Sequence, residues 1–190
     1  MKIAICGKMG TGKTYFADYI TKKYDFRKAS FAKRLKTLAE ELFDMTHKDR
    51  GLLIDLATKM REIDSRVWIK AMFRDIKNYE NIVLDDLRLN NEYITLKESG
   101  WFIIKIDIDE NERISRLKQK YGEYYEEHSE CFKSITENDV IRLDDSHFDM
   151  IITNDNRDEM LEALNNIIRN ELMQKRAARA DERRGYIFDI

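Results

Sequence analysis

Proline is absent from this chain of 190 residues, which removes one class of helix stop, and cysteine occurs only as Cys6 and Cys131. The two cysteines lack the spacing of a metal-binding pair, and their scarcity favours a reducing, intracellular compartment. No apolar run approaches the ~20 residues of a membrane-spanning helix, and the first run is too short for a signal peptide. We therefore predict a cytoplasmic protein with no membrane partner and a buried, unreactive Cys6.

An excess of charge of either sign is also missing. The chain has 34 basic and 36 acidic residues, for a net charge of −2. No overall field then draws the protein to nucleic acid, so we expect no nucleic-acid partner. The length is that of one domain, which we place at residues 1–173, followed by a charged tail at residues 174–190.

The glycines that are present gather near the N-terminus. Residues 7–14 read Gly-Lys-Met-Gly-Thr-Gly-Lys-Thr and match the P-loop pattern G-x-x-x-x-G-K-[ST] at every fixed position. A short apolar run precedes them, and apolar residues at helical spacing follow. Glycine lets the backbone N–H groups turn inward and, with the N-terminus of the next helix, cradle phosphate oxygens. A purely structural glycine turn is the alternative, and the two flanks count against it.

This loop predicts ATP and Mg²⁺ as cofactors. We expect Lys13 to reach the β- and γ-phosphates and the hydroxyl of Thr14 to ligate Mg²⁺. The predicted cradle consists of Gly7, Met9, Gly10, Thr11, Gly12, Lys13 and Thr14.

Apolar runs of strand length alternate with helical patterns along the rest of the chain. Such alternation predicts an α/β, three-layer P-loop kinase fold: a parallel sheet with helices on both faces and a mobile lid. Ligands then lie beyond the carboxyl ends of the strands. We expect strands near residues 2–6, 25–29, 81–86, 101–106 and 148–153, and helices near 13–23, 30–43, 52–60, 67–76, 89–99, 110–120 and 158–173.

Polar residues stand where two of these strands end. Asp85 and Asp86 follow the clearest internal strand, and Asn154 follows the last one. A carboxylate in such a position holds Mg²⁺ in P-loop enzymes, directly or through water, so Asp86 is the second predicted metal ligand with Thr14. Arg88 lies two residues further on and can reach the same edge of the sheet. We also expect Ser30 to cap the helix that follows it.

Basic residues cluster in segments that should overhang this edge. Phosphoryl transfer depends on positioning and on positive charge around the transferring group, with a cover that excludes water. The chain is short and has no N-K-x-D base-reading element, which favours a small-molecule kinase. Many of these charges could equally form solvated helix faces. They are Lys33, Arg34, Lys36, Lys59, Arg61, Arg88, Arg113 and Arg116.

Several segments resemble, in order, those of the deoxynucleoside monophosphate kinases of phages and viruses, a P-loop family related to dephospho-coenzyme A kinase and phosphomevalonate kinase. The similarity extends over about residues 1–165. Ser65 departs from it, because the family usually has proline there. The segments are residues 7–14, 29–36 ("F-A-x-x-L-K"), 59–68 ("R-x-x-D-P-x-x-W"), 83–92 ("V-x-x-D-x-R-x-x-N-E"), 128–130, 148–149 and 154–155.

The resemblance implies transfer of the γ-phosphoryl group of ATP to a (deoxy)nucleoside monophosphate, in the host cytoplasm if the protein is viral. It implies acceptor binding by Lys33, Arg61 and Arg88, with Asp86 at the metal or the acceptor. Arg113 and Arg116 would belong to a lid at about residues 113–130, with Arg113 and Asn154 on the nucleotide. The implied catalytic residues are Lys13, Asp86, Arg88 and Arg116.

Two other functions stay open at this point. One is a kinase for another small acceptor, dephospho-coenzyme A being the first. The other is a P-loop protein that binds ATP for regulation or assembly. The preferred base and sugar, and the choice between monomer and homodimer, are open as well.

Overall fold

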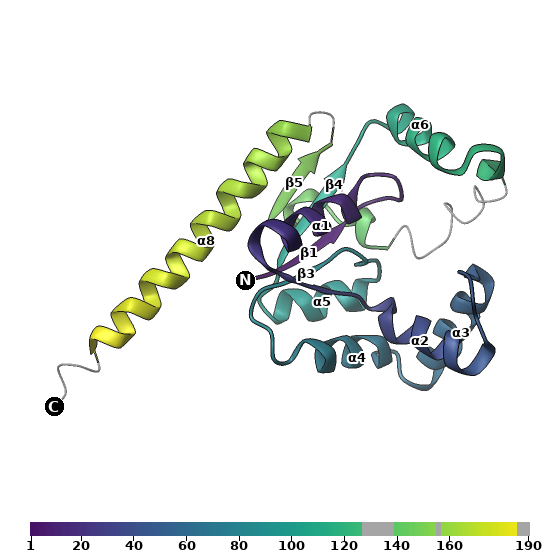
Figure 1. The fold of residues 1–190 in the computed structure, drawn as a ribbon, viewed down its shortest axis with the longest axis horizontal. Helices are drawn as coiled ribbons and strands as arrows, with labels where there is room; N and C mark the ends of the chain where they lie inside the picture. The colour runs from purple at the N-terminus through teal and green to yellow at the C-terminus, as the bar shows by residue number, and fades with distance from the viewer. Residues whose placement is uncertain (127–138, 155–156, 186–190) are drawn as a thin grey trace.

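A parallel sheet forms the centre of the protein in the computed structural model, which describes residues 1–126, 139–154 and 157–185 (Figure 1). The strand order is β2-β3-β1-β4-β5, and all neighbouring strands run parallel. The strands are β1 (Lys2–Cys6), β2 (Arg27–Ala29), β3 (Ile82–Leu84), β4 (Phe102–Asp107) and β5 (Met150–Thr153). Each lies within or close to a run that the sequence predicted as a strand.

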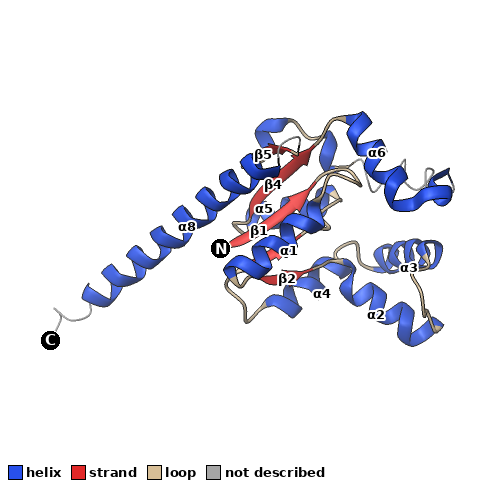
Figure 2. Cartoon of the chain, turned by 45° about the horizontal axis from the view of Figure 1, so that its top comes forward, coloured by secondary structure: helices blue, strands red, loops and turns tan. Residues whose placement is uncertain are grey.

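Helices connect the strands and cover the sheet. Both are visible in Figure 2, where helices are blue and strands red. The α-helices are α1 (Lys13–Tyr24), α2 (Ala32–Phe43), α3 (Arg50–Ile63), α4 (Val67–Ile76), α5 (Asn90–Glu98), α6 (Glu110–Tyr121) and α8 (Arg157–Gly185). Short 3₁₀ helices are η1 (Gly122–Tyr124), η3 (Val140–Arg142) and η4 (Asp145–His147).

Two apolar layers enclose the sheet. On one face α1 and α8 pack through Phe16, Ile20 and Leu164, and on the other α4 and α5 pack through Met72 and Leu96. Burying apolar side chains on both faces of a parallel sheet supplies most of its stability. The predicted three-layer α/β fold is therefore confirmed.

A separate arm lies beside the sheet. Helices α2 and α3 pack on α4 around the buried Trp68, whose indole N–H donates to the carbonyl of Ala57 at 3.4 Å. Figures 1 and 2 both show α6 apart from the α2–α3 pair, at the end of the molecule away from the free end of α8. We call α2 and α3 the acceptor arm and α6 the donor arm, after the roles that the sequence resemblance implies for them.

The last helix is longer than the sequence pattern predicted. The pattern ended near Met173, whereas α8 continues to Gly185, through most of the segment that we expected to be a charged tail. No proline or glycine occurs in α8 before Gly185, so no helix-breaking residue ends this helix earlier. In Figure 1 the C-terminal half of α8 extends away from the sheet. Within the described residues we find no helix with the length and apolar character of a membrane span.

The start of α2 corrects the prediction that Ser30 is an N-cap. The hydroxyl of Ser30 donates to Oδ2 of Asp86 at 2.6 Å instead of accepting from the helix. Asp86 itself accepts from the backbone N–H groups of Phe31 (3.2 Å) and Ala32 (3.1 Å). A carboxylate that arrives from the end of β3 thus takes the place of the local cap, and the sequence around Ser30 could not show it.

Glu92 organises the start of α5 in a similar way. Its Oε2 accepts from the backbone N–H groups of Arg88 and Leu89, both at 3.0 Å, although the residue is only 6% exposed. Burial raises the pKa of Glu92 to about 7, while the two N–H donors and nearby Arg61 oppose that rise. The carboxyl group therefore titrates near neutral pH directly beneath the turn that carries Arg88.

Replacing Glu92 with glutamine should change how stability depends on pH. The folded pKa near 7 lies above the ordinary 4.5, so the folded state favours the protonated form, and wild-type stability falls as pH rises between these values. With each unit of the pKa difference worth about 1.4 kcal/mol, this loss amounts to at most about 3.5 kcal/mol. Glu92→Gln keeps an acceptor for both N–H groups and should lack the loss, as seen in melting temperatures from pH 4.5 to 7.5. Exposed Glu98→Gln is the control; parallel curves for wild type and Glu92→Gln would contradict the prediction.

Candidate active site

The loop between β1 and α1 has the backbone of an anion cradle. Gly7, Gly10 and Gly12 adopt φ values of 142°, 92° and 96°, which side-chain-bearing residues rarely tolerate. At Gly7 a Cβ atom would lie 2.4 Å from the carbonyl oxygen of Ile106 in β4, so the loop passes too close to the sheet for any other residue. No side chain caps α1, since Gly12 precedes it, and its first N–H groups are placed to bind an anion.

The two polar residues that end the motif border this cradle. Nζ of Lys13 donates to the carbonyl oxygens of Gly7 (2.6 Å) and Lys8 (2.7 Å), so the ammonium group lies across the loop. Thr14 is exposed. Its hydroxyl can therefore meet a ligand from solvent.

Hydrogen bonds of two buried residues also hold the P-loop in place. Thr11 is only 1% exposed, and its hydroxyl donates to the carbonyl of Lys8 at 3.0 Å. Asn154, at the end of β5, is 5% exposed and donates its side-chain amide to the carbonyl oxygen of Thr11 at 2.7 Å. The sequence placed Asn154 on the nucleotide; the structure shows its side chain bonded to the P-loop backbone.

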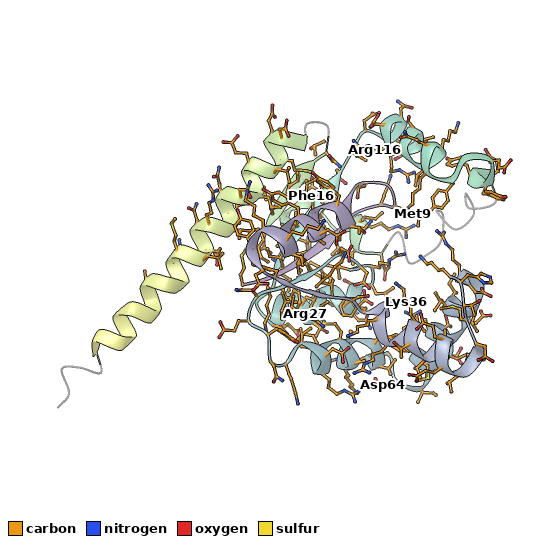
Figure 3. All side chains as sticks on the ribbon, viewed as in Figure 1. Met9, Phe16, Arg27, Lys36, Asp64 and Arg116 are labelled. Carbon is orange, nitrogen blue, oxygen red and sulfur yellow. The ribbon has the colours of Figure 1, made fainter. Side chains whose placement is uncertain are left out.

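Both predicted lid arginines reach backbone carbonyls of this region. Arg113 donates to the carbonyl of Met9 at 3.0 Å, and Arg116 to that of Asn154 at 3.3 Å. Glu110 accepts from Arg113, and this hydrogen bond, with the charges of Arg113 and Lys8, lowers the pKa of Glu110 to about 2. In Figure 3 Arg116 lies on α6 and Met9 on the loop beside it. Residues 127–130 of the predicted lid, including His128, lie outside the described residues.

One contact that joins the two arms was not predicted. Arg50, the first residue of α3, donates to the hydroxyl of Tyr121 at 3.0 Å, and that hydroxyl contacts the sulfur of Met9 at 3.8 Å. Tyr121 ends α6, so this chain of contacts connects the acceptor arm, the donor arm and the P-loop. The sequence offered the tyrosine and the arginine, but no pattern relates residues 71 positions apart.

Several positively charged side chains lie near Lys48. Burial, followed by the charges of Arg50, Lys36, Arg88 and Lys120, lowers the pKa of Lys48. These cations come from both arms and from the turn after β3. Figure 3 shows Lys36 on α2 and Met9 on the P-loop at the same side of the molecule. Among the described residues, no carboxylate pairs with Lys36, Lys48, Arg50 or Lys120. We call Lys36, Lys48, Arg50, Arg88 and Lys120 the cation cluster.

The predicted acceptor residues do not all converge. Arg88 is exposed on the turn held by Glu92, and Arg61 is close enough for its charge to lower the pKa of Glu92 against the larger effect of burial. Lys33 instead pairs with Asp75 of α4 at 3.6 Å. The structure thus holds Arg88 directly above Glu92, brings Arg61 within range of the charge of Glu92, and gives Lys33 an ion pair.

The carboxylates after β3 have protein partners. Asp85 pairs with Lys28 at 3.2 Å, and burial raises the pKa of Asp86 against the effect of its three donors. Those donors occupy three of the roughly four acceptor positions of a carboxylate, so one remains for a metal or its water. In the described part of the chain no three His, Cys, Asp or Glu residues form a metal-binding group. Thr14 and Asp86 can therefore supply at most two ligands of Mg²⁺, and phosphate oxygens and water would fill the other coordination positions.

A groove of about 420 Å³ lies elsewhere and contains no P-loop residue. It runs between α2 and α4, with Leu38, Met60 and Trp68 among its apolar residues and Arg34 and Asp75 among its charged ones. Of the basic residues that the sequence placed over the sheet edge, Arg34 lines this groove, where it pairs with Asp75.

Comparison with known proteins agrees with this architecture. A shikimate kinase from Bacteroides thetaiotaomicron has a TM-score of 0.55 and 17% identity, covering 92% of this chain and 98% of its own. A gluconokinase from Sinorhizobium meliloti 1021 has a TM-score of 0.53 and 14% identity, covering 91% and 96%. The protein TT1252 from Thermus thermophilus has a TM-score of 0.54 and 17% identity, covering 90% and 97%. Identities this low show a shared fold and nothing about activity.

The curated proteins include no match. The AAA_18 family, described as an AAA domain, matches residues 3–133, a stretch that includes the P-loop, the acceptor arm and α6. The resemblance to viral deoxynucleoside monophosphate kinases finds no further support in these comparisons. Because the matched residues make up more than half of the sequence, the chain belongs to the AAA_18 family of AAA domains.

Proposed function

We propose that the protein is an ATP-dependent kinase that transfers the γ-phosphoryl group to a (deoxy)nucleoside monophosphate. The observation that carries this proposal is the cation cluster, whose members come from both arms and from the turn after β3. Donor phosphates would occupy the cradle of residues 7–14, and the cluster supplies further positive charge from the acceptor arm. An acceptor that bears its own phosphate would offset the mutual repulsion of these cations, whereas a neutral sugar would not.

The carboxylate at the end of β3 also favours a phosphate acceptor. Asp86 is engaged by Ser30, Phe31 and Ala32. An alcohol acceptor needs a base to remove its proton during transfer. A phosphate monoester has a second pKa near 6, so its oxygen is already ionised at neutral pH and needs no base. Asp86 would then act by holding the start of the acceptor arm.

Positioning and charge would do most of the chemistry. The cradle and Lys13 orient the donor, Arg113 and Arg116 of the donor arm lie beside it, and Arg50 approaches from the acceptor arm. Closing the arms together would exclude water and so favour transfer over hydrolysis. Bound Mg²⁺ would neutralise phosphate charge, with Thr14 as its protein ligand and Asp86 nearby, directly or through water.

An acceptor panel tests the proposal. Purified protein with ATP and Mg²⁺ is assayed for ADP release and for phosphorylated product with dAMP, dGMP, dCMP, dTMP, the four ribonucleotides, dephospho-coenzyme A, shikimate and gluconate. We expect rapid turnover only with one or more nucleoside monophosphates. Turnover with only dephospho-coenzyme A or a sugar acid would identify that compound as the acceptor in place of a nucleoside monophosphate. Slow ATP hydrolysis that no acceptor changes would favour an ATP-binding regulatory protein.

Lys13→Ala should abolish transfer without unfolding the protein. The ammonium group is placed to stabilise charge on the transferring phosphoryl group, so we expect kcat to fall about a hundredfold or more. Its bonds to Gly7 and Lys8 are local to the loop, and the melting temperature should change little. Lys22→Ala, on the exposed last turn of α1, is the matched control. Near-normal turnover of Lys13→Ala would show that the loop is only a structural turn.

Arg88→Lys should weaken binding of the acceptor and leave binding of ATP nearly unchanged. A guanidinium group binds two phosphate oxygens at once, which an ammonium group cannot reproduce. We expect kcat/KM for the acceptor to fall about thirtyfold to a thousandfold, with little change in the KM for ATP. Arg74→Lys, exposed on α4, is the control, and steady-state kinetics with each substrate varied give the answer. Equal loss for both substrates would assign Arg88 to the donor or to a structural role.

A further inference from the structure

The carbonyl oxygen of Thr11 ties the P-loop to the end of strand β5. Asn154, at the end of β5, donates its amide N–H to this oxygen at 2.7 Å, in a site where both residues are almost fully buried. A buried amide and a buried carbonyl that lost this bond would each be left without water. The orientation of the Thr11–Gly12 peptide is therefore tied to β5.

The bond also fixes the direction of a donor. A trans peptide is planar, and its C=O and N–H bonds point in opposite directions. No cis peptide is present among the described residues. With the oxygen of Thr11 turned toward Asn154, the N–H of Gly12 must point away from Asn154. This N–H is therefore directed to the side of the loop away from β5.

The packing around Gly12 is consistent with this tight contact. A Cβ atom at position 12 would lie 2.7 Å from Nδ2 of Asn154, a separation that real Cβ atoms do not show. Glycine is thus required here both by the φ of 96° and by the approach of the asparagine. The two residues fit each other, although 142 positions separate them in the sequence.

The backbone of Asn154 is held as firmly as its side chain. Its N–H donates to the carbonyl of Asp107, where β4 ends, at 2.7 Å. Its carbonyl accepts from Arg116 of the donor arm at 3.3 Å. Asn154 therefore joins three parts of the site, namely the P-loop, the sheet edge and α6.

We propose that Asn154 is a positioning residue that orients the Thr11–Gly12 peptide so that the N–H of Gly12 faces the phosphates of the donor nucleotide. This inference rests on the proposed nucleotide binding and changes the role of Asn154 from a nucleotide ligand to a clamp behind the loop. A donor that is fixed before binding costs no ordering when the ligand arrives, so the clamp raises affinity without touching the nucleotide.

Asn154→Asp distinguishes the effect of the hydrogen bond from the effect of the shape of the side chain. Asn154→Ala removes the bond and leaves the peptide free to rotate. Asn154→Asp keeps the shape but has no N–H to donate, and its carboxylate faces the carbonyl oxygen of Thr11. If Asn154 acted through its shape alone, Asn154→Asp would behave like the wild type.

The matched control is another asparagine that joins elements far apart in the sequence. Oδ1 of Asn165 in α8 accepts from the hydroxyls of Tyr19 (2.8 Å) and Tyr24 (2.7 Å) at the far end of α1. Asn165→Ala removes two hydrogen bonds without touching the P-loop. It reports what a general loss of stability does to nucleotide binding.

The experiment measures Mg²⁺–ADP and Mg²⁺–ATPγS binding by titration calorimetry, and the backbone amide resonance of Gly12 by two-dimensional NMR, with melting temperatures for every variant. We expect Asn154→Ala and Asn154→Asp to raise Kd about 10- to 100-fold and to shift the Gly12 resonance in the nucleotide-free protein. Asn165→Ala should leave both unchanged, even where its melting temperature falls as far.

Each other result has a definite meaning. Wild-type affinity in both Asn154 variants, with an unmoved Gly12 resonance, would overturn the clamp while leaving the donor site in place. Equal weakening by Asn165→Ala would show that the effect is general instability and would also overturn it. A wild-type protein that binds neither nucleotide would overturn the proposed function itself.

Discussion

The structure depends on holding an energetically unfavourable loop. Residues 7–12 bring three glycines with positive φ and a row of N–H groups to one point, an arrangement that an isolated chain would not keep. Three contacts support it: the close approach of Gly7 to β4, the buried hydroxyl of Thr11, and the amide of Asn154. The order of the parallel strands makes this possible, because β1, β4 and β5 are neighbours and end at the same edge.

The same edge explains why the two arms meet at the loop. Helices α2 and α3 leave from β2, and α6 leaves from β4, which lie on opposite sides of β1. Each arm is anchored by a carboxylate: Asp86 receives the first N–H groups of the α2 region, and Asp109 accepts from the N–H groups of Asn111 and Glu112 in α6. Carboxylates near helix N-termini are favourable, and here they also set where each arm begins.

Local signals in the sequence predicted more of the fold than of the site. The P-loop and the strand runs are short patterns of consecutive residues, so their positions could be read directly. The site required contacts across the chain: Asp86 replaces the expected cap at Ser30, and Arg50 meets Tyr121. Lys33 matched the expected pattern, yet Asp75 of α4 engages it. The end of α8 was missed for a different reason, since a change in composition does not stop a helix that lacks proline and glycine.

Charge around the loop connects these observations to the choice of acceptor. Burial and the charges of cations from separate elements lower the pKa of Lys48, and bringing like charges together in a partly buried place costs free energy in the absence of an anion. A fold retains such a cost where a ligand removes it. If one nucleotide places its phosphates on the P-loop, as proposed, the cation cluster would bind a second anionic group. Because Arg50 reaches Met9 through Tyr121, filling the acceptor side would alter contacts at the loop that holds the donor. The two substrates would thereby be coupled through one arginine and one tyrosine.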